Sequence, residues 1–338
     1  MDGRLLMRAS FALVPVLLFL AVLVRADSYK LLPLRTVLSI AAAGALAAGA
    51  SYVANVLAFT HFAGDFAAYS RYVSPWIEES LKAVALVFLI RTRRVGLPVD
   101  AGIAGFAIGT GFALIENIYY LMSRPDTALY VQVIRGFDTA IMHGGTATIM
   151  AMISVTLYER RPNGGLYLLL PGFTVAVALH AGFNQLLVRP ALATFATVLV
   201  LPLVIYLVFK HSEQVLRDWL DSDLDSKVQL LESINSGTFL DGSSGRMLRS
   251  LSDRFRGEDL ADMLCLLRLH GELALRAKGI LLLRESGMEE PPLDEETRDK
   301  LAELTHLERA IGRTGMLALR PLMMATGKDM WQLELLKS

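Results

Sequence analysis

Cysteine is nearly absent from this 338-residue chain: Cys265 stands alone, which excludes a fold built on intramolecular disulfides. The sequence also lacks the HExxH signature of many zinc proteases, a Cys/His cluster with metal-ligand spacing, a phosphate-binding loop and an internal repeat. Its 33 basic and 33 acidic side chains balance to a formal net charge of +0, and no basic tract is present. These absences give no indication of nucleic acid binding, and we expect neither a bound metal nor another cofactor.

Hydrophobic residues, by contrast, make up 54% of the chain, with a mean hydropathy of +0.45. Up to position 209 they form long apolar runs, each near the ~20 residues that a membrane-spanning helix needs. From position 210 onward, charged and apolar residues alternate at helical spacing. We therefore predict an all-α protein with a polytopic membrane bundle of about seven spans over 1–209 and a soluble helical domain over 210–338. The expected spans are 7–24, 36–60, 75–91, 98–122, 136–158, 165–188 and 191–209.

Positive charge predicts how this bundle is oriented in the lipid bilayer. Arginines and lysines gather after the first, third, fifth and seventh spans, for example at Arg91, Arg93 and Arg94 after the third. Cytoplasmic loops carry such an excess of cations. We expect a multi-pass protein of the plasma (bacterial inner) membrane, with its N-terminus outside and its C-terminal domain in the cytoplasm, where that domain is available to a cytoplasmic partner.

Ionisable side chains recur inside the expected spans, although a charge at the bilayer centre costs at least ~2.5 kcal/mol. The predicted orientation puts six of these polar residues in the outer part of the bilayer, and their shared depth favours a single site. These six candidate catalytic residues are Glu78, Glu79, Glu116, His143, His180 and Asn184.

Three further residues have supporting positions on the same helices. Lys82 lies four residues after Glu78, so the two share a helix face, and Phe112 shares a face with Glu116, which it precedes by four residues. Asn117 follows Glu116 directly. Each of these groups, taken alone, is also compatible with a neutralised ion pair or an interhelical packing contact. Two adjacent glutamates with one lysine nevertheless leave one carboxylate without a cation, which favours a functional site.

Carboxylates, imidazoles and an amide at one depth suit the activation of water and the hydrolysis of a peptide bond. A buried glutamate can act as a general base, and His180 with Asn184 can donate to the developing oxyanion. No serine or cysteine is placed with a base as a nucleophile would be. A metal ion held by the glutamates and histidines is the chemical alternative.

Four motifs in order resemble the PrsW family of membrane proteases, which is grouped with CAAX prenyl endopeptidases and bacteriocin-processing enzymes. They are EESLK, FALIEN, the helix containing His143, and HAGFN, within a core of residues 75–187. The resemblance implies a glutamate-type intramembrane protease in which Glu78 or Glu79 activates water and His180 with Asn184 forms the oxyanion site. CAAX-type relatives have FxxxH where this chain has FALIE, so either Glu116 or His143 is the second partner of the water. The resemblance also implies a single-pass membrane substrate, such as an anti-sigma factor whose cleavage starts a stress response.

Two other classes of function fit some of these features. A proton-coupled transporter would also bury glutamates and histidines, but it would usually show a repeat relating two halves of the bundle. A non-catalytic scaffold would use the polar cluster only for helix packing and its cytoplasmic domain for a partner. Substitution of Glu78 or Glu79 in a folded, inserted protein separates the protease from the scaffold.

Overall fold

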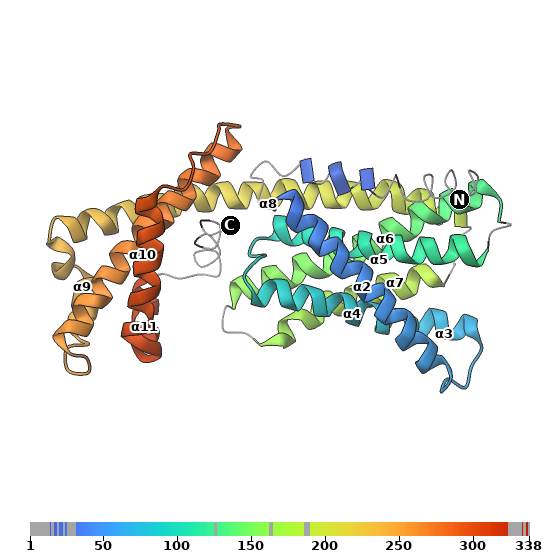
Figure 1. The fold of residues 1–338 in the computed structure, drawn as a ribbon, viewed down its shortest axis with the longest axis horizontal. Coiled ribbons are helices and arrows are strands. Elements are labelled where there is room, and N and C mark those ends of the chain that lie inside the picture. Colours follow the sequence, from blue (N-terminus) through green and yellow to red (C-terminus); the bar gives the residue numbers. More distant parts are fainter. Residues whose placement is uncertain are drawn as a thin grey trace. The chain divides into compact units, whose positions relative to one another are not determined.

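A computed structural model describes residues 32–124, 127–161, 165–185 and 190–323, together with isolated positions between 14 and 25 and at 333 and 336. Throughout these residues the secondary structure is helical and contains no strand, which confirms the all-α prediction (Figure 1). Most of the expected first span, 7–24, lies outside the described residues. The chain divides into two compact units, Met1–Glu213 and Gln214–Ser338, whereas the sequence places its domain boundary between 209 and 210.

The first unit contains the helices of the expected membrane bundle. They are α2 (Leu34–Phe59), α3 (Phe66–Tyr72), α4 (Ser74–Arg91), α5 (Pro98–Ser123), α6 (Leu129–Arg160), the 3-10 turn η1 (Leu166–Leu169), α7 (Leu170–Asn184) and the first part of α8 (Pro190–Asn235). Among the described residues, α2, α5, α6 and the continuous segment Leu166–Asn184 are long and apolar enough to cross a membrane. The helical membrane bundle is therefore confirmed, while the number of seven spans stays a prediction.

Proline and aspartate mark several of these helix starts. Pro75, Pro98 and Pro171 occupy the first turns of α4, α5 and α7, where a missing backbone N–H removes no helical hydrogen bond. Asp65 precedes α3 and accepts a hydrogen bond from the backbone N–H of Ala68. The Asp65 cap thus marks the start of α3 as a helix separate from α2. Pro75 marks the start of α4 three residues before Glu78.

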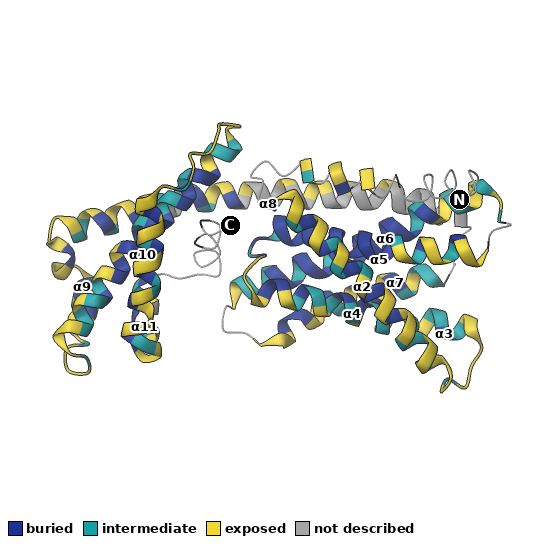
Figure 2. Cartoon of the chain, in the orientation of Figure 1, coloured by how far each residue is buried: buried dark blue, intermediate teal, exposed yellow. Residues whose placement is uncertain are grey.

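Helix α5 lies at the centre of the bundle and is buried along most of its length (Figure 2). It packs against α2 on one side and α6 on the other. A Cβ atom at Gly109 would overlap the backbone carbonyl of His143 on α6, and one at Gly111 would overlap the carbonyl of Ala41 on α2. Glycine therefore permits close backbone approach here, and the α5–α6 contact brings Glu116 within reach of His143.

Helices α4 and α7 complete the surroundings of α6. Each contacts α6, and they also contact each other and the short helix α3. Glu79 and Lys82 are fully buried on α4, and His180 is 2% exposed on α7. The charged stretch of α4 is thus enclosed by neighbouring helices, which is the arrangement that ionisable groups in a membrane protein require.

The second unit contains the rest of α8, the 3-10 turn η2 (Thr238–Asp241), α9 (Ser243–Arg249), α10 (Gly257–Glu285) and α11 (Glu295–Met323). Helix α10 supplies much of its core, including Met263, Leu266 and Leu273, which are at most 2% exposed. Gly237, with φ of 76°, has the left-handed conformation that commonly ends a helix, and it follows the last residue of α8 by two positions.

Candidate active site

Glu79 on α4 is the most enclosed carboxylate of the site, with no exposed surface. Its Oε1 atom accepts hydrogen bonds from Lys82 Nζ at 2.7 Å and His180 Nδ1 at 2.8 Å, and a longer one from Thr146 Oγ1 at 3.4 Å. Its Oε2 atom is also buried but has no hydrogen-bond partner. Glu79 therefore joins α4 to α6 and α7 through one oxygen and leaves the other oxygen available.

Lys82 connects Glu79 to His143 on α6. Its ammonium nitrogen lies 2.7 Å from His143 Nδ1 and 4.6 Å from the centre of the Phe112 ring. Because an ammonium group can only donate, Nδ1 is the acceptor and the imidazole proton lies on Nε2. That proton is donated to Glu116 Oε2 at 2.5 Å. Glu116 is the more accessible end of the chain, with 26% of its side chain exposed.

Glu78 approaches the same imidazoles from the adjacent position on α4. Its Oε1 atom accepts hydrogen bonds from Ser74 Oγ at 2.6 Å and Asn55 Nδ2 at 3.4 Å. Its Oε2 atom lies 3.8 Å from His180 Nε2. His180 donates its Nδ1 proton to Glu79, so Nε2 presents a lone pair toward Glu78. This pair of atoms is too far apart for a direct hydrogen bond.

Three other predicted residues lie beside the cluster in different ways. Phe112 packs its ring 4.6 Å from that of His143. Asn117 donates to the carbonyl of Gly136 at 3.2 Å, and Asn184 donates to the carbonyl of Ser70 at 3.0 Å. Both amides thus bind backbone groups in this structure, and a role of Asn184 as oxyanion donor stays a prediction.

The structure adds three polar residues that the sequence analysis did not select. Ser74 precedes Glu78 by one helical turn, so its spacing could have revealed it. Asn55 on α2 and Thr146 on α6 are 23 and 67 positions from the glutamates that they contact. No local pattern could have connected them to the site.

The donor atoms suit a divalent metal ion. One oxygen of Glu78 and one nitrogen from each of His143 and His180 lie within 4.8 Å of one another. Two imidazoles and a carboxylate form a known ligand set of catalytic zinc. The formal charges also fit, because among the described residues Lys82 is the one cation hydrogen-bonded to any of the three glutamates of the cluster, and it pairs with Glu79. The residues present therefore fit a metal, although the sequence analysis expected none.

A family comparison agrees with this arrangement. Residues 32–208, just over half of the chain, match the family described as PrsW family intramembrane metalloprotease. The chain belongs to this PrsW family. Among curated proteins and among solved structures, none matches the chain.

PrsW membership confirms the predicted membrane peptidase. The matched range runs from α2 into α8 and contains every residue of the hydrogen-bonded cluster. Most of the second unit lies beyond it.

Proposed function

We propose that this PrsW-family protein cuts a single-pass membrane regulator, of the anti-sigma factor type, near the outer boundary of the bilayer. The observation that carries the proposal is the convergence of Glu78, His143 and His180 from three helices, with donor atoms within 4.8 Å of one another. Such a group can hold one water molecule against a peptide carbonyl. The arginine pattern of the loops supports the outer location, and a substrate helix is easier to unwind at its end than in mid-membrane.

Glu79 is proposed to position His180. It accepts the Nδ1 proton at 2.8 Å, which directs the Nε2 lone pair toward Glu78. Carboxylates that bind the second nitrogen of a ligating histidine fix its tautomer and the orientation of its ring. Because Oε1 of Glu79 already accepts three donors and the side chain has no exposed surface, whereas Glu116 is partly exposed, the geometry favours this positioning role over the general-base role that the sequence also allowed.

Glu116 is proposed as the general base. Lys82 occupies Nδ1 of His143, so Nε2 is the only nitrogen with which His143 can engage another group, and it can do so as a ligand only after its proton has passed to solvent. Loss of that proton also removes the hydrogen bond from His143 to Glu116. Glu116 can then take a proton from water as the water oxygen attacks the carbonyl carbon, and return that proton to the leaving amine as the C–N bond breaks.

Glu78, His143 and His180 would hold the metal ion that the family description implies. When bound, the ion would supply a polarised water that is nucleophilic at neutral pH. The surrounding residues limit the access of bulk water whether or not a metal is bound. Helices α5 and α6 pack tightly, and the ring of Phe112 packs against that of His143.

The test is cleavage of single-pass reporter proteins by the purified protein in vesicles. Glu78→Gln, Glu79→Gln and His180→Ala should each lower kcat/KM at least about 100-fold, because groups that act as a unit are not additive. Glu258→Gln, on a glutamate whose side chain is 81% exposed in the second unit, is the matched control. Full cleavage by the Glu78→Gln, Glu79→Gln double variant would eliminate this site as the catalytic centre.

A further inference from the structure

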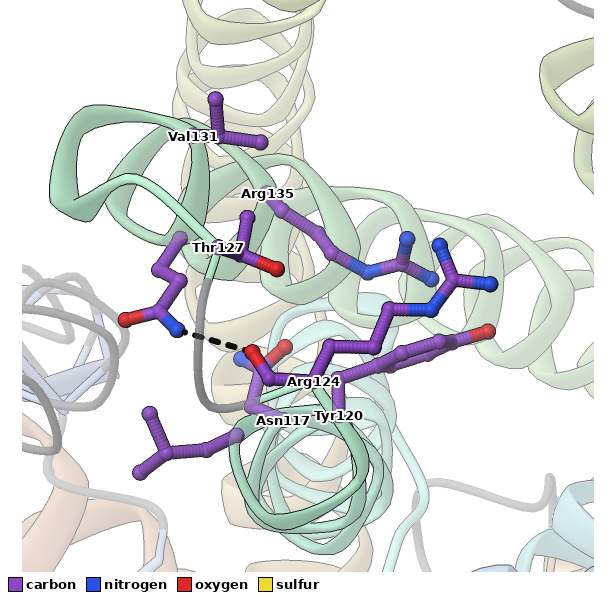
Figure 3. Close-up of a pocket in the computed structure, with 8 residues that line it drawn as sticks. Asn117, Tyr120, Arg124, Thr127, Val131 and Arg135 are labelled. Atoms are coloured by element: carbon purple, nitrogen blue, oxygen red, sulfur yellow. Dashed lines mark hydrogen bonds between the residues drawn. The ribbon is translucent and has the colours of Figure 1, made fainter.

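A small cavity with two arginines opens one helical turn from the catalytic cluster, where α5 ends and α6 begins. Its volume is about 90 Å³, and Asn117, Tyr120, Arg124, Gln132 and Arg135 contribute to its wall. A cavity needs about 10–15 Å³ of such space to hold one water molecule, so this one is large enough for a carboxylate-sized group. In Figure 3 the side chains of Arg124 and Arg135 extend in the same direction, toward the hydroxyl end of Tyr120.

The cavity has an excess of positive charge. The guanidinium group of Arg135 lies 3.2 Å from the centre of the Tyr120 ring. Among the residues that the structure describes, no carboxylate lies within ion-pair distance of Arg124 or Arg135, and Glu116 acts on Arg135 only at longer range. Two cations that share a pocket at a membrane boundary repel each other, and an anion between them would relieve that repulsion. Guanidinium groups bind carboxylates with paired, directional hydrogen bonds.

Gln132 adds an acceptor to these donors. Its Nε2 donates to the backbone carbonyl of Arg124 at 3.4 Å, while its Oε1 is buried and has no hydrogen-bond partner. A buried acceptor without a partner carries a desolvation penalty that a ligand N–H can remove. The cavity therefore presents cationic donors together with an acceptor. An acidic segment of a peptide chain offers the complement, a carboxylate and a backbone N–H, whereas a phosphodiester offers only acceptors.

The cavity is also in line with the catalytic cluster. Glu116, Tyr120 and Arg124 follow one another at intervals of four residues along α5, so they form one row on the helix surface. From Glu116 to Arg124 the helix rises roughly 12 Å. An extended peptide covers this distance in about four residues. A substrate strand lying along α5 would thus place a nearby side chain at the arginines.

We infer that Arg124, Arg135 and Gln132 form a specificity subsite for an acidic residue of the substrate, about three to four positions from the bond that is cut. The inference rests on the proposed function, because it defines the subsite relative to the same catalytic cluster. The carboxylate binds between the two guanidinium groups. A backbone N–H further along the same peptide segment donates to Gln132 Oε1, because the Gln132 amide binds the backbone carbonyl of Arg124, on the opposite side of the cavity from the guanidinium groups (Figure 3). The choice of substrate then depends on an acidic side chain near the cleaved bond, in addition to how easily the substrate helix unwinds.

The first arm of the test compares reporter substrates in phosphatidylcholine vesicles. Single glutamates are placed two to five residues on either side of the mapped cut, each with a glutamine twin. At one position the glutamate reporter should have about tenfold higher kcat/KM, the effect expected of one charge-assisted contact. This glutamate-to-glutamine ratio should fall to about one in Arg124→Gln and Arg135→Gln. It should be intermediate in Arg135→Lys, which keeps the charge and loses the paired geometry.

Arg91→Gln removes an exposed arginine at the far end of α4 and should leave the ratio as in the parent. A ratio near one at every position in the parent protein overturns the inference and leaves the proposed protease function intact. Loss of the ratio in Arg91→Gln as well would also overturn it, since a general surface charge would then explain the preference.

The second arm measures binding without cleavage, with a labelled peptide that copies the flanking segment and the full-length protein in detergent. Arginine-dependent binding of the glutamate peptide, with no cleavage of any reporter, supports the subsite and rejects the proposed function. Absence of both binding and cleavage rejects both. If phosphatidylglycerol vesicles instead bind in an arginine-dependent manner while the two peptides bind equally, the cavity is a lipid site and the inference is wrong.

Discussion

Lys82 Nζ lies 2.7 Å from His143 Nδ1, and this contact determines which imidazole nitrogen carries the proton. The same ammonium group lies 2.7 Å from Glu79 Oε1, and both Lys82 and Glu79 are completely buried. One cation thus neutralises a buried carboxylate and orients a histidine from a different helix. Stability and catalysis are both expected to depend on it.

We predict that Lys82→Met lowers the free energy of unfolding by roughly 3–5 kcal/mol, because it leaves the Glu79 carboxylate buried without its cation. Adding Glu79→Gln to Lys82→Met should recover much of the loss, since the uncompensated charge is gone. Proteolysis should stay absent in both variants, because His143 loses its contact with Lys82 in each of them, and His180 also loses the Glu79 carboxylate in the double variant. Thermal unfolding in detergent and reporter cleavage give the two measurements. Equal stability of the single and double variants would contradict the buried-charge explanation.

Metal removal separates the two ways in which water can be activated. The donor set of Glu78, His143 and His180 and the family description lead us to expect that strong chelators abolish cleavage and that added zinc restores it. Elemental analysis should find about one metal per chain in the parent and a large loss in His180→Ala. Unchanged activity in chelator would instead support the metal-free glutamate mechanism expected from the sequence.

The second unit should show a pH dependence of its own through Glu272 and Lys300, whose side chains lie 2.8 Å apart. Burial raises the pKa of Glu272, but hydrogen bonds from Lys300 and Arg268 outweigh it and hold that pKa below its ordinary value. Hydrogen bonds to Glu272 and Glu296 raise the pKa of Lys300 above its ordinary value. The lowered pKa of Glu272 stabilises the fold above about pH 4.3, and that contribution is lost as pH falls through the folded-state pKa.

For Lys300 the direction is opposite. Its contribution is complete below about pH 10.4 and is lost as pH rises through the raised folded-state pKa. We expect Glu272→Gln to lower the urea midpoint of this unit near neutral pH, and the difference from the parent to vanish well below pH 4. Fluorescence of Trp219 in a Trp76→Phe, Trp331→Phe background reports on the unit. A difference that persists unchanged at pH 2 would show that packing, not charge, explains the effect.

Topology can be tested independently of activity. Seven spans with arginine-rich odd loops require that Ser338 face the cytoplasm and Met1 the outside. A reporter fused after Ser338, and another in the Arg91–Gly96 loop, should both give the cytoplasmic signal. In a Cys265→Ser background, Met122→Cys should react with an impermeant thiol reagent from outside. Labelling of the Arg91 loop from outside would mean that the spans are miscounted and that the outer location of the site is wrong.

Several features of this protein could be predicted from particular residues. Apolar runs and Pro98 predicted α5 within about one residue of its observed limits, because bilayer length and helix-start chemistry act locally. Glu78, Glu79, His143 and His180 were selected because charges within apolar spans are costly. Asn55 and Thr146 could not be selected, since each is an ordinary helix residue until another helix packs beside it.

Hydropathy and charge are local properties of the chain, so the membrane class, the helical fold and the identity of the ionisable residues could be predicted from the amino acids alone. The division of roles among these residues depends on how the helices pack. Only the packing of α4 against α6 and α7 shows Lys82 between Glu79 and His143, and Glu79 behind His180. Hydrogen-bond partners across helices depend on close backbone approach, such as that at Gly109, and no spacing within one helix encodes them.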